Sequence, residues 1–199
     1  MKTWVCIISL MVMIGSLLVL AGCHQLAQDT PPPAVPPLFV ADFDRCQATN
    51  NLGGEMGPAS NPPDSLIETY IEEAGRGCVA RLDYEITGWA AFWLKLQGAD
   101  LRSYQALRFD VRADAQIGIP DQMKVELKRS QGTEIALIYV ADIEVDWKTV
   151  RIDLASFRPT GTNPRLATWE GMEDLVFVFE SAKSGGEGRV YLDNIAFER

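Results

Sequence analysis

The sequence predicts an all-β fold, a jelly-roll β-sandwich of about ten strands that occupies Leu38–Arg199. Apolar residues alternate with period two through most of this region, and no long segment has the period of a helix. Turns rich in glycine, proline and asparagine recur every eight to twelve residues or so, as in sandwiches and jelly rolls. About 160 residues are enough for one domain with its own core.

The closing strand, Val190–Phe197, has an interrupted alternation. Val190 and Leu192 share one face, but after Asp193 the parity slips by one and the apolar set continues with Ile195. A β-bulge absorbs such an extra residue and keeps the apolar side chains on the inner face. The opening segment, Phe39–Asp44, also ends in an acid. We expect these two end strands to pair and close the sandwich, with their acids near a metal ion.

Regular alternation predicts the strands between the two ends. These are Leu66–Glu73, Cys78–Ile86, Ala90–Leu96, Gln105–Ala113, Met123–Leu127 and Trp147–Leu154. Glu134–Val140 and Leu175–Glu180 are apolar on both faces, which is typical of central strands that are covered twice. Arg45–Pro63 and Phe157–Thr168 are expected to be loops, and Trp169–Glu173 one helical turn.

The N-terminus is predicted to be a lipoprotein signal peptide, residues 1–22. Lys2 precedes an uncharged apolar run, Val5–Leu20, and small residues follow it. This order is typical of an export signal. Leu20-Ala-Gly-Cys23 resembles the bacterial lipobox, which implies cleavage before Cys23 and lipid attachment to its thiol. An uncleaved membrane anchor and a plain secretory signal are the alternatives, and both also export the domain.

Residues 23–37 are predicted to be the lipidated cysteine and a proline-rich, extended tether. His24, which is the only histidine, lies in this segment, so no histidine base is expected inside the fold. His24 follows Cys23 where an aspartate would retain a lipoprotein in the inner membrane. By resemblance to enterobacterial lipoproteins, this implies a lipid-anchored protein of the cell envelope, sorted to the outer membrane if the cell has one.

The four cysteines are expected to have different roles. Cys6 leaves with the leader and Cys23 carries the lipid. Cys46 and Cys78 remain in an oxidising compartment, which favours a disulfide. The alternative is two buried free thiols.

The chain is acidic. Its net charge is −9 and becomes −10 when cleavage removes Lys2, the only charged residue of the leader. No basic stripe is present to neutralise phosphates, so nucleic acid is not an expected partner.

Five segments, taken in order, resemble those of the galactose-binding-like jelly rolls. They are Val40–Asp44, Asn50–Gly54, Tyr104–Asp110, Trp147–Leu154 and Val190–Phe197. Within that group the chain is most similar to the family-eleven carbohydrate-binding modules and the complex I intermediate-associated family. The first likeness implies glycan binding, and the second implies a protein-interaction or assembly module.

Related modules carry a structural calcium between an acid after the first strand and an aspartate in the last strand. The resemblance places these ligands at Asp44 and Asp193. Calcium takes six to eight oxygens, which carbonyls of Arg45–Gly54 and the carboxylate of Asp42 would supplement. Alternatively, Asp44 caps a turn and Asp193 bonds the amides of the bulge. No catalytic cofactor is expected.

Trp89 and Trp93 are the strongest candidates for ligand contact. Four residues apart on a strand, they project from the same polar face, about 13 Å apart. Indole faces suit the C–H faces of sugar rings, and nearby polar groups suit the hydroxyls. The predicted groove places Trp93 with Arg108, Asp110 and Glu126. The alternative is a Trp89 packed under a loop and charges paired across strands on a solvated face.

Catalysis is not expected. Glu144-Val-Asp146 resembles the start of the catalytic strand of jelly-roll glucanases, Glu-x-Asp-x-x-Glu, but Thr149 stands where the last acid belongs. The sequence has neither a histidine-based triad nor a phosphate-binding loop. It therefore predicts a non-catalytic, lipid-anchored module that binds a glycan, or in the alternative an envelope protein.

Overall fold

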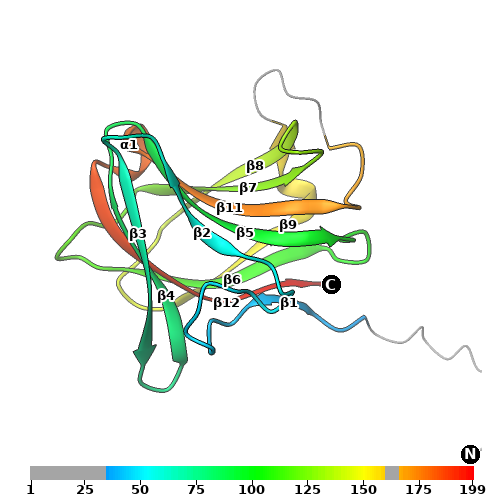
Figure 1. Ribbon diagram of the computed structural model, residues 1–199, viewed down its shortest axis with the longest axis horizontal. Helices are drawn as coiled ribbons and strands as arrows, with labels where there is room; N and C mark the ends of the chain where they lie inside the picture. The colour runs from blue at the N-terminus through cyan, green and yellow to red at the C-terminus, as the bar shows by residue number, and fades with distance from the viewer. Residues whose placement is uncertain (1–34, 160–165) are drawn as a thin grey trace, which may run out of the picture. The chain divides into compact units, whose positions relative to one another are not determined.

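Two stacked antiparallel sheets of six strands each make up the domain (Figure 1). The structure, a computed structural model, describes residues 35–159 and 166–199. The predicted leader, Cys23 and the tether as far as Ala34 lie outside the described residues. The predicted all-β jelly-roll sandwich is confirmed, with twelve strands rather than about ten.

The sheet that contains both ends of the domain, here called the β12 sheet, has the order β3-β4-β12-β6-β9, and β1 pairs with β12. Its strands are β1 (Leu38–Ala41), β3 (Ser65–Glu73), β4 (Gly77–Glu85), β6 (Ala106–Ala113), β9 (Lys148–Asp153) and β12 (Glu187–Glu198).

The other sheet, here called the β11 sheet, has the order β10-β8-β7-β11-β5-β2. Its strands are β2 (Met56–Ser60), β5 (Trp89–Ala99), β7 (Gln122–Arg129), β8 (Glu134–Ala141), β10 (Arg158–Pro159) and β11 (Met172–Glu180). Two single turns, η1 (Leu154–Ser156) and α1 (Ser181–Ser184), complete the elements. Among the described residues no helix has the length and hydropathy of a membrane span.

The first and last strands pair, as the sequence predicts. Leu38 of β1 lies opposite Phe197 of β12. The register between β12 and β6 slips between Asp193 and Ala196, and Asn194 has a φ of 51°. This is the predicted bulge, and it keeps Leu192, Ile195 and Phe197 buried in spite of the change in parity.

The core lies between the two sheets and uses the predicted inward sets of β4, β5, β6 and β7. Phe109 of β6 meets Phe177 of β11 edge to face at 5.2 Å, and Tyr84 of β4 stacks on Phe179 of β11 at 4.4 Å. Each such side chain contributes on the order of 1.5–3 kcal/mol through burial. These contacts hold the two sheets together along β11.

The Cys46–Cys78 disulfide is confirmed, with Cα atoms 5.5 Å apart. It ties the segment after β1 to the start of β4.

Four local predictions are wrong. Arg158–Pro159, expected to be part of a loop, forms the short strand β10. Met56–Ser60 is a strand rather than loop, because β2 is an edge strand, where Pro58 loses no ladder bond. Trp169–Glu173 contains no helix; β11 begins at Met172. Glu134–Val140 is not central, because only the two-residue β10 lies outside it, and Tyr139 is exposed.

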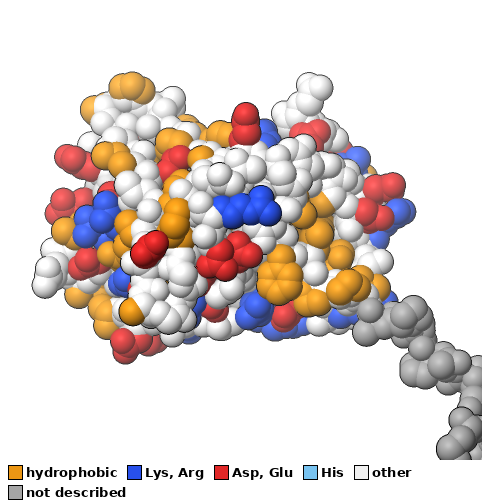
Figure 2. All heavy atoms as spheres, turned by 60° about the horizontal axis from the view of Figure 1, so that its bottom comes forward, with side chains coloured by type: hydrophobic (Ala, Val, Ile, Leu, Met, Phe, Trp, Pro, Cys, Tyr) orange, Lys and Arg blue, Asp and Glu red, His pale blue; other side chains and the backbone are white. Residues whose placement is uncertain are grey.

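Acidic and basic side chains alternate over the face of the molecule in Figure 2, with hydrophobic ones scattered among them. On this face no patch of a single sign stands out, in keeping with the absence of a basic stripe in the sequence.

Candidate functional site

The outward side chains of the β11 sheet form straight rows across three strands, because β5, β11 and β7 pair directly opposite one another. Four rows result: Lys95–Asp174–Lys128, Trp93–Val176–Glu126, Ala91–Val178–Lys124, and Trp89–Glu180. Side chains opposite each other on one face lie close enough to interact.

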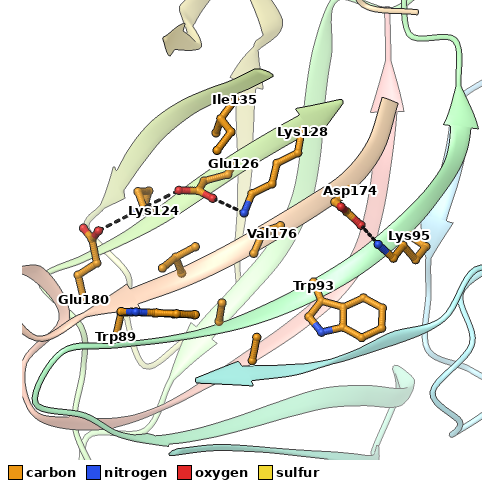
Figure 3. A pocket seen from close by; sticks show the side chains of 13 residues that line it. Trp89, Trp93, Lys95, Lys124, Glu126, Lys128, Ile135, Asp174, Val176 and Glu180 are labelled. Atoms are coloured by element: carbon orange, nitrogen blue, oxygen red, sulfur yellow. Dashed lines mark hydrogen bonds and ion pairs between the residues drawn. The ribbon is translucent and has the colours of Figure 1, made fainter. Parts of the chain in front are cut away.

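These rows line a groove of about 530 Å³, here called the β11 trough (Figure 3). Its floor is apolar: Ala91, Val176 and Val178 form a small buried cluster on the outer face, separate from the main core. The trough therefore has β11 as its floor, the indoles of β5 as one wall and the charged side chains of β7 as the other.

Trp93 is held in place from two sides. Its Nε1–H donates to the carbonyl of Pro58 at 3.1 Å. Its ring lies against Gly57, where a Cβ atom would come within 3.1 Å of the ring. Trp89 is 38% exposed at the start of β5. The two predicted tryptophans thus share one trough.

The turn before Trp89 is organised by a single carboxylate. Asp64 Oδ1 accepts hydrogen bonds from the backbone N–H of Thr87 at 2.7 Å and from its hydroxyl at 2.9 Å. Asp64 Oδ2 accepts from the N–H groups of Gly88 at 3.0 Å and Trp89 at 2.8 Å. A Cβ on Gly88 would lie 2.8 Å from that oxygen, so this turn needs glycine. Asp64 therefore fixes where β5 begins and where Trp89 starts.

The charged wall consists of ion pairs. Lys124 Nζ lies 2.6 Å from Glu180 and 3.0 Å from Glu126. Lys128 Nζ lies 2.9 Å from Glu126, and Lys95 Nζ lies 2.8 Å from Asp174. Three lysines thus face three carboxylates in the trough, and Glu126, which is 7% exposed, is the most buried of the three acids.

The pKa values of the Lys124–Glu180 pair keep both groups charged at neutral pH. Burial lowers the pKa of Lys124, but hydrogen bonds to Glu180 and Glu126 outweigh it and raise the pKa overall. Burial raises the pKa of Glu180, but hydrogen bonds from Lys124 and Tyr139 bring it below its usual value. The trough offers charged donors and acceptors with almost no net charge.

Two of the predicted groove residues lie elsewhere. Arg108 and Asp110 are on β6, in the β12 sheet, so the grouping of Trp93 and Glu126 with them is wrong. Arg108 pairs with Glu198 instead. Alternation along a strand tells which residues share a face, but it does not tell to which of two sheets the strand belongs.

Asp110 instead lies in a polar cluster with Asp193. Arg76 Nη1 is 3.0 Å from Asp110 and 2.8 Å from Asp193, and its guanidinium stacks over Trp147 at 4.1 Å. Asn194 donates to both carboxylates. Burial raises the pKa of Asp193. Burial also acts on Asp110, but hydrogen bonds from Thr149, Asn194 and Arg76 lower its pKa overall.

The residues expected to hold calcium do not fit that ion. Asp193 already has the guanidinium of Arg76 as its cation. Asp44 is exposed and lies against Gly77 at the start of β4. Within residues 35–159 and 166–199, no group of three or more histidine, cysteine, aspartate or glutamate side chains is arranged to hold a metal. We therefore assign no role to calcium.

Several trough residues were not singled out from the sequence: Lys95, Lys124, Lys128, Asp174, Val176, Val178 and Glu180. The apolar character of both faces of Leu175–Glu180 was the available signal. One face of that strand faces the core, and Val176 and Val178 on the other form the floor of the trough.

No protein-family model and no curated protein matches the sequence. Solved structures do match. A family 11 carbohydrate-binding module of the cellulase Lic26A-Cel5E from Clostridium thermocellum aligns with a TM-score of 0.65 at 15% identity, over 83% of this chain and 95% of the module. The fold is similar to that of carbohydrate-binding modules.

A second structure of a Clostridium thermocellum family 11 module, in complex with a β-1,3-1,4-mixed-linked tetrasaccharide, gives a TM-score of 0.66 at 16% identity, over 83% of this chain and 96% of that one. A family 29 module in complex with mannohexaose gives 0.54 at 13% identity, over 81% and 90%. At these identities the likeness establishes the fold.

Proposed function

We propose that the protein is a non-catalytic carbohydrate-binding protein that takes an oligosaccharide in the β11 trough. The observation that carries the proposal is the trough itself: two indoles and an apolar floor face a wall of charged hydrogen-bonding groups. Sugar rings have apolar C–H faces and polar edges, so such a groove suits them. The structural neighbours that bind a mixed-linked glucan tetrasaccharide and mannohexaose support the ligand class.

The experiment is a titration of the purified full-length protein against a glycan panel that includes both of these oligosaccharides, followed by tryptophan fluorescence and calorimetry. Trp93→Ala and Trp89→Ala are each expected to weaken binding of the glycan that the panel identifies by about tenfold, or about 1.4 kcal/mol. Trp147→Phe, just before β9 of the opposite sheet, is the matched aromatic control and should bind as the unsubstituted protein does.

Two results would contradict the proposal. In the first, no glycan of the panel binds. In the second, a glycan binds but neither tryptophan of the trough matters. A protein partner that protects Trp93 from solvent would instead favour the protein-interaction alternative.

We further propose that a lipid on Cys23 anchors the domain at a bacterial cell envelope. The support is the lipobox Leu20-Ala-Gly-Cys23 and the proline-rich segment after it. Labelling with a radioactive fatty acid in a bacterial host should mark the protein and not the Cys23→Ser variant. Equal labelling of both would contradict the anchor.

A further inference from the structure

We infer that the bound glycan lies along β11, parallel to the strand, and that it is a neutral chain long enough to reach from Asp174 to Glu180. This inference rests on the proposed function and adds the direction, length and charge of the ligand.

The direction follows from the floor. Asp174, Val176, Val178 and Glu180 are consecutive outward residues of one strand, so the trough runs along β11 for about 20 Å. Its apolar part is the central pair of valines, and an acid stands at each end. Trp89 and Trp93 lie on the same side of this line, on β5 (Figure 3).

A ligand that crossed the strands would meet both walls. The row through the middle of the trough is Trp93–Val176–Glu126. On the neighbouring strands this row continues to Gly57 of β2 at one end and to Leu137 of β8 at the other. A crossing chain would have to pass over the indole of Trp93 and over Glu126, which both flank the valine floor (Figure 3). A chain along β11 meets neither obstacle.

The two walls also differ in chemistry, which gives the chain an orientation about its own axis. The C–H faces of the sugars match the indoles on the β5 side. The hydroxyl edges match Glu126 and its two lysines on the β7 side. Since the indoles are about 13 Å apart, they stack on different sugars of one chain rather than on one sugar.

Charge argues for a neutral ligand. Every lysine of the trough is paired with a carboxylate of the trough. An acidic sugar would compete with Glu126 for Lys124 and Lys128, and the most buried acid of the trough would then lose its partners, which is costly.

The test combines oligosaccharides of increasing length with two sets of variants. The probes are the neutral oligosaccharides of one to six sugars from whichever polysaccharide the panel identifies. The end variants are Asp174→Asn and Glu180→Gln. The crossing variants are Leu137→Ala and Leu137→Gln on β8, at a position on the same outer face that pairs with Glu126 and does not line the trough. Unchanged melting temperatures confirm that each variant is folded.

Affinity should rise with chain length until the chain spans the trough. Each end variant should weaken binding of the longest oligosaccharide by about tenfold and leave the shortest unaffected, while the crossing variants should change affinity less than about twofold. As a measurement that needs no substitution, amide chemical-shift changes on ligand addition should follow Asp174–Glu180 rather than spread over β2 and β8. Tetragalacturonate, the acidic probe, should not bind.

The outcomes separate the two proposals. If no glycan binds, the proposed function fails. If a glycan binds but the crossing variants weaken it and the end variants do not, only the direction fails. If tetragalacturonate binds more tightly than the neutral probes, the charge of the ligand is wrong.

Discussion

Arg76 Nη1 lies 2.8 Å from Asp193 Oδ2, so the β3–β4 turn supplies the positive partner of the buried carboxylate at the bulge of the closing strand. The same guanidinium contacts Asp110 and stacks on Trp147. One side chain from the β3–β4 turn therefore contacts two strands of the β12 sheet, β6 and β12, and the segment that leads into β9.

Arg76→Ala should lower the free energy of unfolding by about 2–3 kcal/mol, because it leaves Asp193 buried without a cation. Urea unfolding followed by circular dichroism measures the change. Arg102→Ala removes an exposed pair with Asp100 and serves as the control, with little change in the free energy of unfolding expected.

Chelation with EDTA should leave the melting temperature of the unsubstituted protein unchanged, because the guanidinium of Arg76 already pairs with Asp110 and Asp193. A clear drop would mean that a metal ion contributes to the fold and that Arg76 is not sufficient.

Asp64→Ala should weaken glycan binding indirectly, because Asp64 positions Trp89 but does not itself line the trough. Asp64 accepts four hydrogen bonds from Thr87, Gly88 and Trp89, and their loss releases the turn that sets the start of β5. We expect a loss of stability, because four donors lose their acceptor, together with a shift in tryptophan emission. Asp146→Ala, an exposed loop position, is the control.

Asp64→Asn keeps one acceptor oxygen and should recover part of the affinity. Neither variant changes a residue that lines the trough. Equal binding by Asp64→Ala and the unsubstituted protein would therefore show that Trp89 needs no such support.

Reduction of Cys46–Cys78 should destabilise the protein by roughly 3–4 kcal/mol, since the bond closes a loop of about 33 residues in the unfolded chain. The shift in urea midpoint between oxidised and reduced protein measures it, and the Cys46→Ser/Cys78→Ser double variant should match the reduced form. A midpoint that does not move would show that the bond contributes nothing to stability.

Stability should fall in acid, below about pH 4.5. Hydrogen bonds and ion pairs lower the pKa of six carboxyl groups below the usual values of 3.8 for aspartate and 4.5 for glutamate: Asp64, Glu73, Asp100, Asp110, Glu134 and Glu180. A lowered folded-state pKa gives stability that is present above the unfolded value and is lost as pH falls through the folded value. Burial raises the pKa of Asp193 and Glu68. These two groups favour the folded state in acid, but they are fewer than the groups with a lowered pKa.

Melting temperatures measured between pH 3 and pH 8 test whether stability falls toward acid pH, as expected. Glu180→Gln should slightly reduce the loss of stability in acid, because it removes one of the six groups with a lowered pKa. A melting temperature that rises toward pH 3 would show that the two raised groups dominate.

Much of the fold could be predicted because one face of most strands is buried. The alternation of Ala90, Phe92, Leu94 and Leu96 reports directly on the core, and all four are buried. The slip after Asp193 likewise predicts the bulge. β2 escaped prediction because an edge strand tolerates Gly57 and Pro58, which in the middle of a sheet would argue against a strand.

The site could be predicted only in part, because it depends on which strands are neighbours. Trp89 and Trp93 follow from their spacing on one strand. The residues that face these indoles are determined by the strand order β7-β11-β5. The local sequence around Lys124 or Asp174 does not indicate that order. For the same reason, the sequence alone does not distinguish Arg108 and Asp110 of β6 from Glu126 of β7, although the two strands belong to different sheets.

The pairing of β1 with β12 has a consequence for how the domain combines with other proteins. Leu38 lies directly across from Phe197, so the chain enters and leaves at one point, in the sheet that does not carry the trough. A domain whose two termini are adjacent can be inserted into a surface loop of another protein, or circularly permuted, with little change to its backbone. Either rearrangement would leave the trough open to solvent.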